Sequence, residues 1–160
     1  MRSPTRMIIH ALVVLTVAVA SARAEAPIDR RAHGRDEAGG VASLARRGDA
    51  RAQTELGFMY ATGRGVPQNF ERAVDWYRRA AEQGDPTAQY LLGLMYDKGQ
   101  GVPQDAILAH KWLILAATKA KGRQREYYAR VRDAVAFKLA PEQIAKAQDL
   151  AVEWKPVRER

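Results

Sequence analysis

Side chains that carry nucleophilic or acid–base catalysis are scarce in this sequence. Nucleophilic catalysis needs a serine, threonine or cysteine beside a general base, and the chain contains no cysteine. Beyond residue 24 it holds one serine, Ser43, and two histidines, His33 and His110. Two separated histidines do not make up the ligand set of a zinc site. We therefore predict no catalytic residue, no metal site and no cofactor, and we expect that the protein is not an enzyme.

Two carboxylates could serve glycoside hydrolysis, which uses a pair of acidic side chains. Asp75 and Glu82 lie three or four residues from Arg78 and Arg79. This is the spacing of ion pairs on one face of a helix. We interpret these residues as solvated surface pairs, not as catalytic acids.

The first 24 residues have the pattern of a secretory signal peptide. Arg2 and Arg6 precede an apolar run from Met7 to Ala20, and the small residues Ala22 and Ala24 predict cleavage after Ala24. The run is shorter than the roughly 20 residues that a helix needs to span a bilayer. We therefore expect removal of the leader, no stable membrane insertion afterwards, and a periplasmic or secreted protein.

The charge of the remaining chain is only mildly basic. Cleavage removes three arginines and no acid, so 26 basic residues become 23 against 18 acids and the net charge falls from +8 to +5. An exported protein with this excess is not expected to bind nucleic acid. We accordingly interpret the arginines around Tyr127–Tyr128 as an exposed helix face; they are Arg123, Arg125, Arg130 and Arg132.

A 36-residue repeat organises the middle of the chain. Residues 48–83 align with residues 84–119 without a gap, and 17 of the 36 pairs are identical. Such self-similarity is typical of solenoids, in which each unit buries its apolar face against its neighbours. His110 aligns with Val74, which favours a packing role or a partly exposed face. Large side chains at fixed repeat positions indicate core packing and not sugar stacking; they are Met59, Trp76, Met95 and Trp112.

Each unit is predicted to be a helix, a glycine-rich turn and a second helix. The turns fall at residues 63–65 and 99–101, and Gly84 can end the preceding helix in a left-handed conformation. Pro86 suits the first position of a helix. The predicted N-caps have side-chain oxygens that can accept from the first free N–H groups: Asp49, Asn69, Asp85 and Asp105.

These motifs resemble the Sel-one-like repeat family, an α/α solenoid class related to tetratricopeptide repeats. The residues that carry the resemblance are G-D at the start of each unit, then A-Q-x-x-L-G-x-M-Y, G-x-G-V-P-Q, a tryptophan and a double alanine. The resemblance implies an all-α fold, an α/α superhelical solenoid of helix-turn-helix repeats with C-terminal capping helices.

The chain on either side of the repeats is predicted to complete this domain, over residues 38–154. The apolar stretch 112–117 must be covered on two sides, so we expect closing helices at 123–139 and 141–154. Residues 139–143 resemble the family's L-T/S-P-E-Q motif, with Ala140 in place of the capping hydroxyl, a loss of about 1 kcal/mol. Residues 43–47 resemble the end of a preceding second helix, which Gly39–Gly40 shortens. Residues 25–37 and 155–160 are predicted to be flexible.

The two faces of the first helices are predicted to differ in role. Positions 52, 53, 56, 57, 59 and 60 are identical between repeats and fall within an arc of roughly 160°, which indicates the packing face. The resemblance implies that the opposite arc lines a concave partner-binding surface. Phe58 and Tyr90 either project from it as an interaction patch or are covered by adjacent helices. The candidate binding residues are Arg51, Thr54, Glu55, Phe58, Thr87, Tyr90, Leu91 and Leu94.

The resemblance further implies an exported protein–protein interaction scaffold or adaptor, with assembly of an envelope complex or modulation of a signalling sensor as its role. An alternative of another class is an envelope-glycan binder or accessory factor of cell-wall enzymes. A degenerate hydrolase is a third reading. Because solenoids of one architecture accept unrelated ligands, the partner protein is not identified by the sequence.

Overall fold

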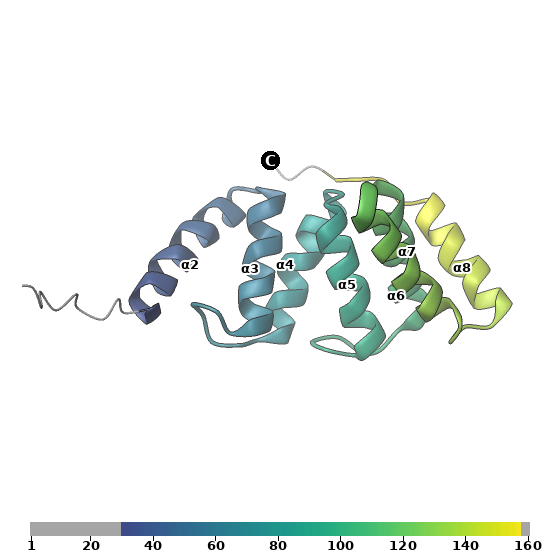
Figure 1. The fold of residues 1–160 in the computed structure, drawn as a ribbon, viewed down its shortest axis with the longest axis horizontal. Helices are drawn as coiled ribbons and strands as arrows, with labels where there is room; N and C mark the ends of the chain where they lie inside the picture. Colours follow the sequence, from purple (N-terminus) through teal and green to yellow (C-terminus); the bar gives the residue numbers. More distant parts are fainter. Residues whose placement is uncertain (1–29, 158–160) are drawn as a thin grey trace, which may run out of the picture. The chain divides into compact units, whose positions relative to one another are not determined.

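Helices joined by short turns make up residues 30–157, which are the residues that the computed structural model describes (Figure 1). No strand occurs within this range, so the predicted all-α class is confirmed. The leader at 1–24, the segment 25–29 and the last three residues lie outside the described part. The helices are α2 Arg30–Arg46, α3 Ala50–Thr62, α4 Phe70–Glu82, α5 Pro86–Lys98, α6 Ala106–Lys119, α7 Gly122–Ala136 and α8 Pro141–Val152.

The two repeats form two helix pairs, α3 with α4 and α5 with α6. All four predicted N-caps are present, with side-chain oxygens 2.7–2.9 Å from the backbone N–H groups that they accept. Gly63 and Gly99 end α3 and α5 in the left-handed conformation. The repeat motif therefore folds as predicted.

The residues shared by the two repeats form the core. Leu56 and Met59 of α3 are buried, as are their repeat counterparts Leu92 and Met95 of α5. A β-carbon on Gly57 would lie 2.6 Å from the ring of Tyr77. The glycine is therefore required so that α4 can approach α3 closely, despite its cost inside a helix.

A buried glutamine ties each repeat to the helix before it. Gln53 Nε2 donates to the carbonyl of Ala45 at 3.1 Å, and Gln89 Nε2 donates to the carbonyl of Ala81 at 3.1 Å. Arg125 lies 36 residues after Gln89, and its Nε donates to the carbonyl of Ala117 at 3.3 Å. Arg125 thus makes the contact that the glutamine makes in each repeat. α7 therefore occupies the place that the first helix of a third repeat would take.

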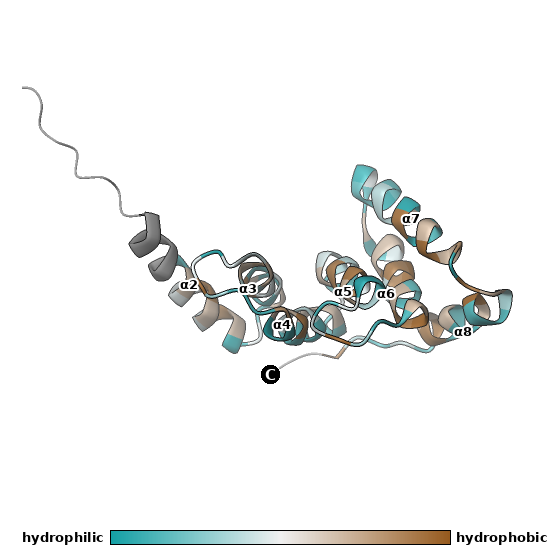
Figure 2. Ribbon diagram, turned by 90° about the horizontal axis from the view of Figure 1, so that it is seen from below, coloured by the Kyte–Doolittle hydropathy of each residue, from teal (hydrophilic) through white to brown (hydrophobic). Residues whose placement is uncertain are grey.

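The closing helices cover α6, as the apolar stretch 112–117 predicts. α6 contacts α5, α7 and α8, and Figure 2 shows the apolar α6 between them. Leu113 and Ala116 are fully buried. After α8, Trp154 packs edge-on against Trp112, with ring centroids 6.4 Å apart, and the N–H of Val157 donates to the carbonyl of Glu82 at 2.8 Å.

The helix before the first repeat is longer than the sequence suggested. α2 continues through Gly39–Gly40, where the sequence predicts a shortened helix, and includes residues 30–37 of the segment predicted to be flexible. Each glycine costs roughly 1 kcal/mol relative to alanine inside a helix. Burial of Ala38 and Ala45 against α3 offsets this cost, and Glu37 pairs with Arg64 at 2.9 Å.

The N-cap of α7 allows a test of whether α7 continues the repeat. Lys121 is the N-cap of α7 and makes no side-chain capping hydrogen bond, whereas Asp49 and Asp85 cap α3 and α5 at the same register. We expect Lys121→Asp to raise the free energy of unfolding by about 1 kcal/mol, because its carboxylate can accept a free N–H of the first turn. Urea denaturation measures the change. Lys121→Ala is the control, and an equal gain in both variants would contradict a capping effect.

Candidate functional site

A groove runs between α3 and α5, and we call it the α3–α5 groove. Its volume is about 520 Å³. It gathers six of the eight residues predicted for the partner-binding surface. The lining residues are Arg51, Thr54, Glu55 and Phe58 of α3, Asp85, Pro86, Thr87 and Leu91 at the start of α5, and Gln124 of α7.

Polar contacts fix the walls of the α3–α5 groove. Thr54 Oγ1 lies 3.2 Å from Asp85 Oδ1, and the same oxygen of Asp85 caps α5. Gln124 Nε2 donates to the hydroxyl of Tyr128 at 2.8 Å and lies 3.4 Å from Thr87 Oγ1. These contacts join α3 to α5 and α5 to α7, so the groove is formed before any partner binds.

The rim of the groove combines the phenyl ring of Phe58 with two charged side chains. Phe58 is 46% exposed, and Arg51 and Glu55 are exposed one helical turn apart on α3. Within residues 30–157 neither charge has an ion-pair partner. Leu91 also lines the groove and is half-buried. The surface can therefore offer both apolar contact and charge to a ligand.

Tyr90 and Leu94 do not line the groove. Tyr90 stacks on Tyr128 with ring centroids 4.3 Å apart, and its hydroxyl lies 3.1 Å from that of Tyr127. Burial, followed by the hydrogen bond with Tyr127, raises the pKa of Tyr90 above its usual range. Leu94 is half-buried further along α5. Each of the two predicted alternatives therefore applies to one residue. Phe58 projects from the surface, whereas Tyr90 is packed against α7.

Three lining residues were missed by sequence reasoning. The sequence predicts Asp85 and Pro86 only as the residues that begin a helix. A residue that caps a helix can, however, also line a groove. Gln124 lies 36 residues after Ala88, so extending the repeat register into α7 would have located it. The signal was weak because little identity continues past residue 119.

The other chemistry-bearing residues pack or pair within the fold. Arg79, Lys111 and Lys119 lie over the rings of Trp76, Trp112 and Trp154, at 4.5–4.9 Å from the ring centroids. These cations cover faces on which a sugar would stack. Asp75 pairs with Arg78 at 3.5 Å, as predicted for a surface ion pair. His110 is buried, which selects the packing role from the two placements that the sequence left open.

The basic run on α7 also has structural partners. Arg125 donates to the carbonyls of Ala117 and Thr118 at the end of α6. Arg132 pairs with Asp133 at 2.7 Å, and Tyr128 is buried. Arg123, Arg125 and Arg130 are nevertheless exposed and Arg132 is half-buried, so the arginines form the exposed helix face that the sequence predicts, while Tyr128 packs against α6.

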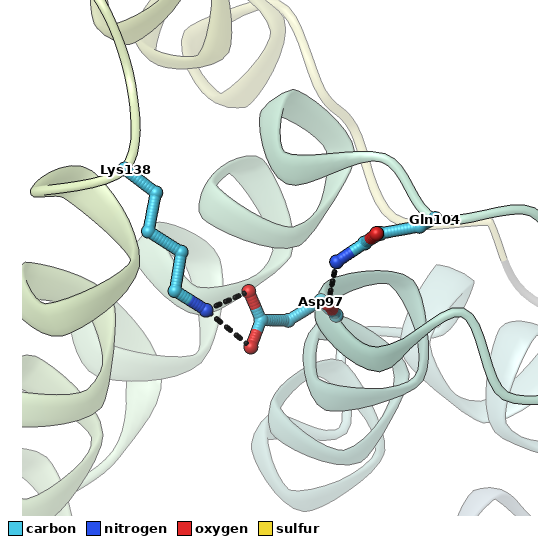
Figure 3. A network of polar contacts seen from close by, with 3 residues as sticks. All are labelled: Asp97, Gln104 and Lys138. Carbon is cyan, nitrogen blue, oxygen red and sulfur yellow. Dashed lines mark hydrogen bonds and ion pairs between the residues drawn. The ribbon is translucent and has the colours of Figure 1, made fainter.

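A polar network at the other end of α5 positions the loop after α7 (Figure 3). Lys138 Nζ lies 2.7 and 2.9 Å from the two carboxylate oxygens of Asp97, and Gln104 Nε2 donates to the carbonyl of Asp97 at 2.7 Å. Gln68 makes the equivalent bond to Ala61 in the first repeat. The glutamine–carbonyl hydrogen bond therefore recurs in both repeats, and the ion pair between Lys138 and Asp97 is added in the second.

Between residues 30 and 157 no three histidine, aspartate or glutamate side chains are grouped so that they could hold a metal ion. In the same range, no helix combines the length and the apolar content needed to cross a membrane.

The comparisons with known proteins agree with this architecture. The family model described as Sel1 repeat matches residues 50–85 and 86–120. The crystal structure of c5321, a protective antigen present in uropathogenic Escherichia coli strains and displaying an SLR fold, is similar with 27% identity and a TM-score of 0.72. The match covers 90% of this chain but only 28% of the antigen. A Sel1 repeat protein from Oxalobacter formigenes is similar with 31% identity and a TM-score of 0.52, over 72% of this chain and 98% of that protein. No curated protein matches the chain.

Proposed function

Because the chain belongs to the Sel1 repeat family, we propose that it is an exported scaffold that binds a segment of another protein in the α3–α5 groove. The observation that carries this proposal is the gathering of six positions that differ between two otherwise similar repeats along one groove. The shared residues build the solenoid. The residues that differ are the ones left to recognise a partner.

The chemistry of the groove suits a short polypeptide segment. A volume of about 520 Å³ lies within the range of about 300–1,000 Å³ typical of binding pockets. Phe58 and Leu91 can receive an apolar side chain, while Thr87 and Gln124 can hydrogen-bond to backbone groups. Arg51 and Glu55 can pair with charges that flank the apolar anchor. A central apolar contact with a polar rim is the usual anatomy of a protein interface.

Export is the second part of the proposal. It is supported by the charged lead, the apolar run and the small residues that precede Glu25. In the envelope, such a scaffold would act as an adaptor that assembles a complex or modulates a signalling sensor. The protein recovered from the envelope or the medium should begin at Glu25, which mass spectrometry can test.

Phe58→Ala is expected to weaken partner binding at least tenfold while leaving the fold intact. The ring is 46% exposed, so its removal should change the free energy of unfolding by less than about 1 kcal/mol. An apolar anchor of an interface can contribute 2 kcal/mol or more to binding. Leu44→Ala is the matched control, because Leu44 is 45% exposed on α2 and does not line the groove.

The experiment places a photocrosslinking residue at position 58 or position 44 in cells and identifies the crosslinked partner. We expect a protein partner from position 58 that is absent from position 44. Binding of the purified pair is then measured for the wild type and both alanine variants. Equal crosslinking from both positions, or loss of the partner after glycan digestion, would reject the groove as a protein-binding site.

A further inference from the structure

The chain continues past α8 as an extended segment, residues 154–157, which we call the C-terminal strap. Figure 1 shows it running back from α8 along one edge of the array towards α4. The N–H of Val157 donates to the carbonyl of Glu82, the last residue of α4, at 2.8 Å. The strap therefore joins the end of the domain to the first repeat.

The first residue of the strap is held by two side chains of α6. Trp154 packs edge-on against Trp112, with ring centroids 6.4 Å apart, and Lys119 Nζ lies 4.9 Å from the centroid of the Trp154 ring. Trp154 is half-buried and packs against the hydrophobic cluster that joins α4, α5 and α6. A large ring packed in this way fixes where the strap begins.

The turn between α4 and α5, which the strap covers, leads directly into the α3–α5 groove. A β-carbon on Gly84 would lie 3.4 Å from the ring of Trp154 and 2.7 Å from Lys119 Nζ, so both side chains lie against this glycine. The next two residues, Asp85 and Pro86, line the groove. The same short turn therefore meets the strap and supplies part of the groove wall.

The contacts that hold this turn to α3 are weak. Gln83 Nε2 donates to Gln53 Oε1 at 2.8 Å, and Thr54 Oγ1 lies 3.2 Å from Asp85 Oδ1. Thr54 Oγ1 also lies 2.9 Å from the carbonyl of Ala50. A hydroxyl has one hydrogen to donate, so Asp85 competes with Ala50 for it. The strap therefore adds support that α3 alone does not give.

The equivalent turn of the first repeat provides an internal comparison. Asp49 caps α3 by accepting from the N–H of Ala52 at 2.8 Å, as Asp85 caps α5 by accepting from the N–H of Ala88 at 2.7 Å. The strap contacts described above all lie at or near the turn before α5, and none of them reaches Asp49. The two turns thus share a cap and differ in the strap.

We propose that the C-terminal strap positions the α4–α5 turn and thereby sets the shape of the α3–α5 groove that meets the partner. Trp154 and Val157 are positioning residues, because they do not line the groove and reach it only through the turn. Where it concerns partner binding, the inference rests on the proposed function. The placement of the turn itself is measured without a partner.

Hydrogen exchange followed by nuclear magnetic resonance compares the amides of Ala88 and Ala52 in the same protein. Val157→Pro removes the N–H that reaches Glu82, and the Ala88 amide should then exchange about fivefold faster, as expected for the loss of one hydrogen bond. Trp154→Ala should speed it by about tenfold or more, because the ring against the turn is lost. The Ala52 amide should keep its rate. A general loss of stability would instead speed both amides by the same factor.

Two control variants separate the strap contacts from other effects of substitution. Val157→Ala keeps the N–H and shortens a side chain that is 61% exposed, so the Ala88 amide should exchange as in the wild type. Val152→Ala changes a side chain that is 85% exposed at the end of α8, next to the strap, and should also leave exchange unaltered. Circular dichroism checks that each variant is folded.

Partner binding is then followed with the photocrosslinking residue at position 58. Trp154→Ala should reduce the yield of the crosslinked partner about fivefold, which is the lower end of couplings between separate sites. Val152→Ala should leave the yield unchanged. If position 58 captures no partner while the Ala88 amide still responds to Val157→Pro, the proposed function fails and the positioning of the turn stands. Equal crosslinking in the wild type and Trp154→Ala, or equal changes at the two amides, would overturn the inference and leave the groove its function.

Discussion

Gly101→Ala is expected to lower the free energy of unfolding by about 2–5 kcal/mol. Gly101 has a φ of +72°, and a β-carbon there would lie 2.4 Å from the carbonyl carbon and oxygen of Phe70. A left-handed conformation costs an alanine roughly 1–2 kcal/mol, and forcing an extra carbon into a packed region costs about 1–3 kcal/mol. The obstructing atoms are backbone at the start of α4, so no side-chain rotation can relieve the clash. Guanidinium denaturation followed by helical circular dichroism measures the loss.

Gly40→Ala is the matched control for this effect. Gly40 lies inside α2, and a β-carbon there would have no heavy atom within 4 Å. Alanine should therefore stabilise the helix by up to about 1 kcal/mol through its higher propensity. A stable Gly101→Ala protein would show that the α5–α6 turn does not pack against α4 as the structure has it.

Tyr77→Ala should have the other large effect, a loss of about 3–5 kcal/mol. Tyr77 is 1% exposed within a core cluster that joins α4, α5 and α6, and burial also raises the pKa of its hydroxyl. Removing the ring forfeits its burial and leaves a cavity between α3 and α4, because Gly57 brings no side chain that could fill it. The same denaturation experiment measures the change.

Phe137→Ala serves as the control for removal of an aromatic ring. Phe137 is 92% exposed at the end of α7, so its loss should change the free energy of unfolding by no more than about 0.5 kcal/mol. Similar losses for Tyr77→Ala and Phe137→Ala would mean that the repeat interface does not carry the stability of the domain.

The sequence by itself determined the repeat unit, its caps and its packing face. These features have local signals: aspartate or asparagine at the start of four helices, glycine at the turns, and apolar positions that are identical in both repeats. Each signal depends on short-range hydrogen bonding or on helical periodicity. The sequence also identified most residues of the α3–α5 groove, because positions that differ between repeats fall on one arc of the helix.

The tertiary structure decided what depends on neighbours distant in the sequence. α7 continues the repeat although Lys121 and Arg125 replace the aspartate and glutamine of the earlier units, and only contact with α6 reveals this. Packing against α3 carries α2 through Gly39–Gly40, and packing against α7 covers Tyr90 while Phe58 stays exposed. The burial of His110 likewise appears only when the helices around α6 meet. Periodicity reports which face of a helix is apolar, whereas the helices that assemble around that face determine how completely it is covered.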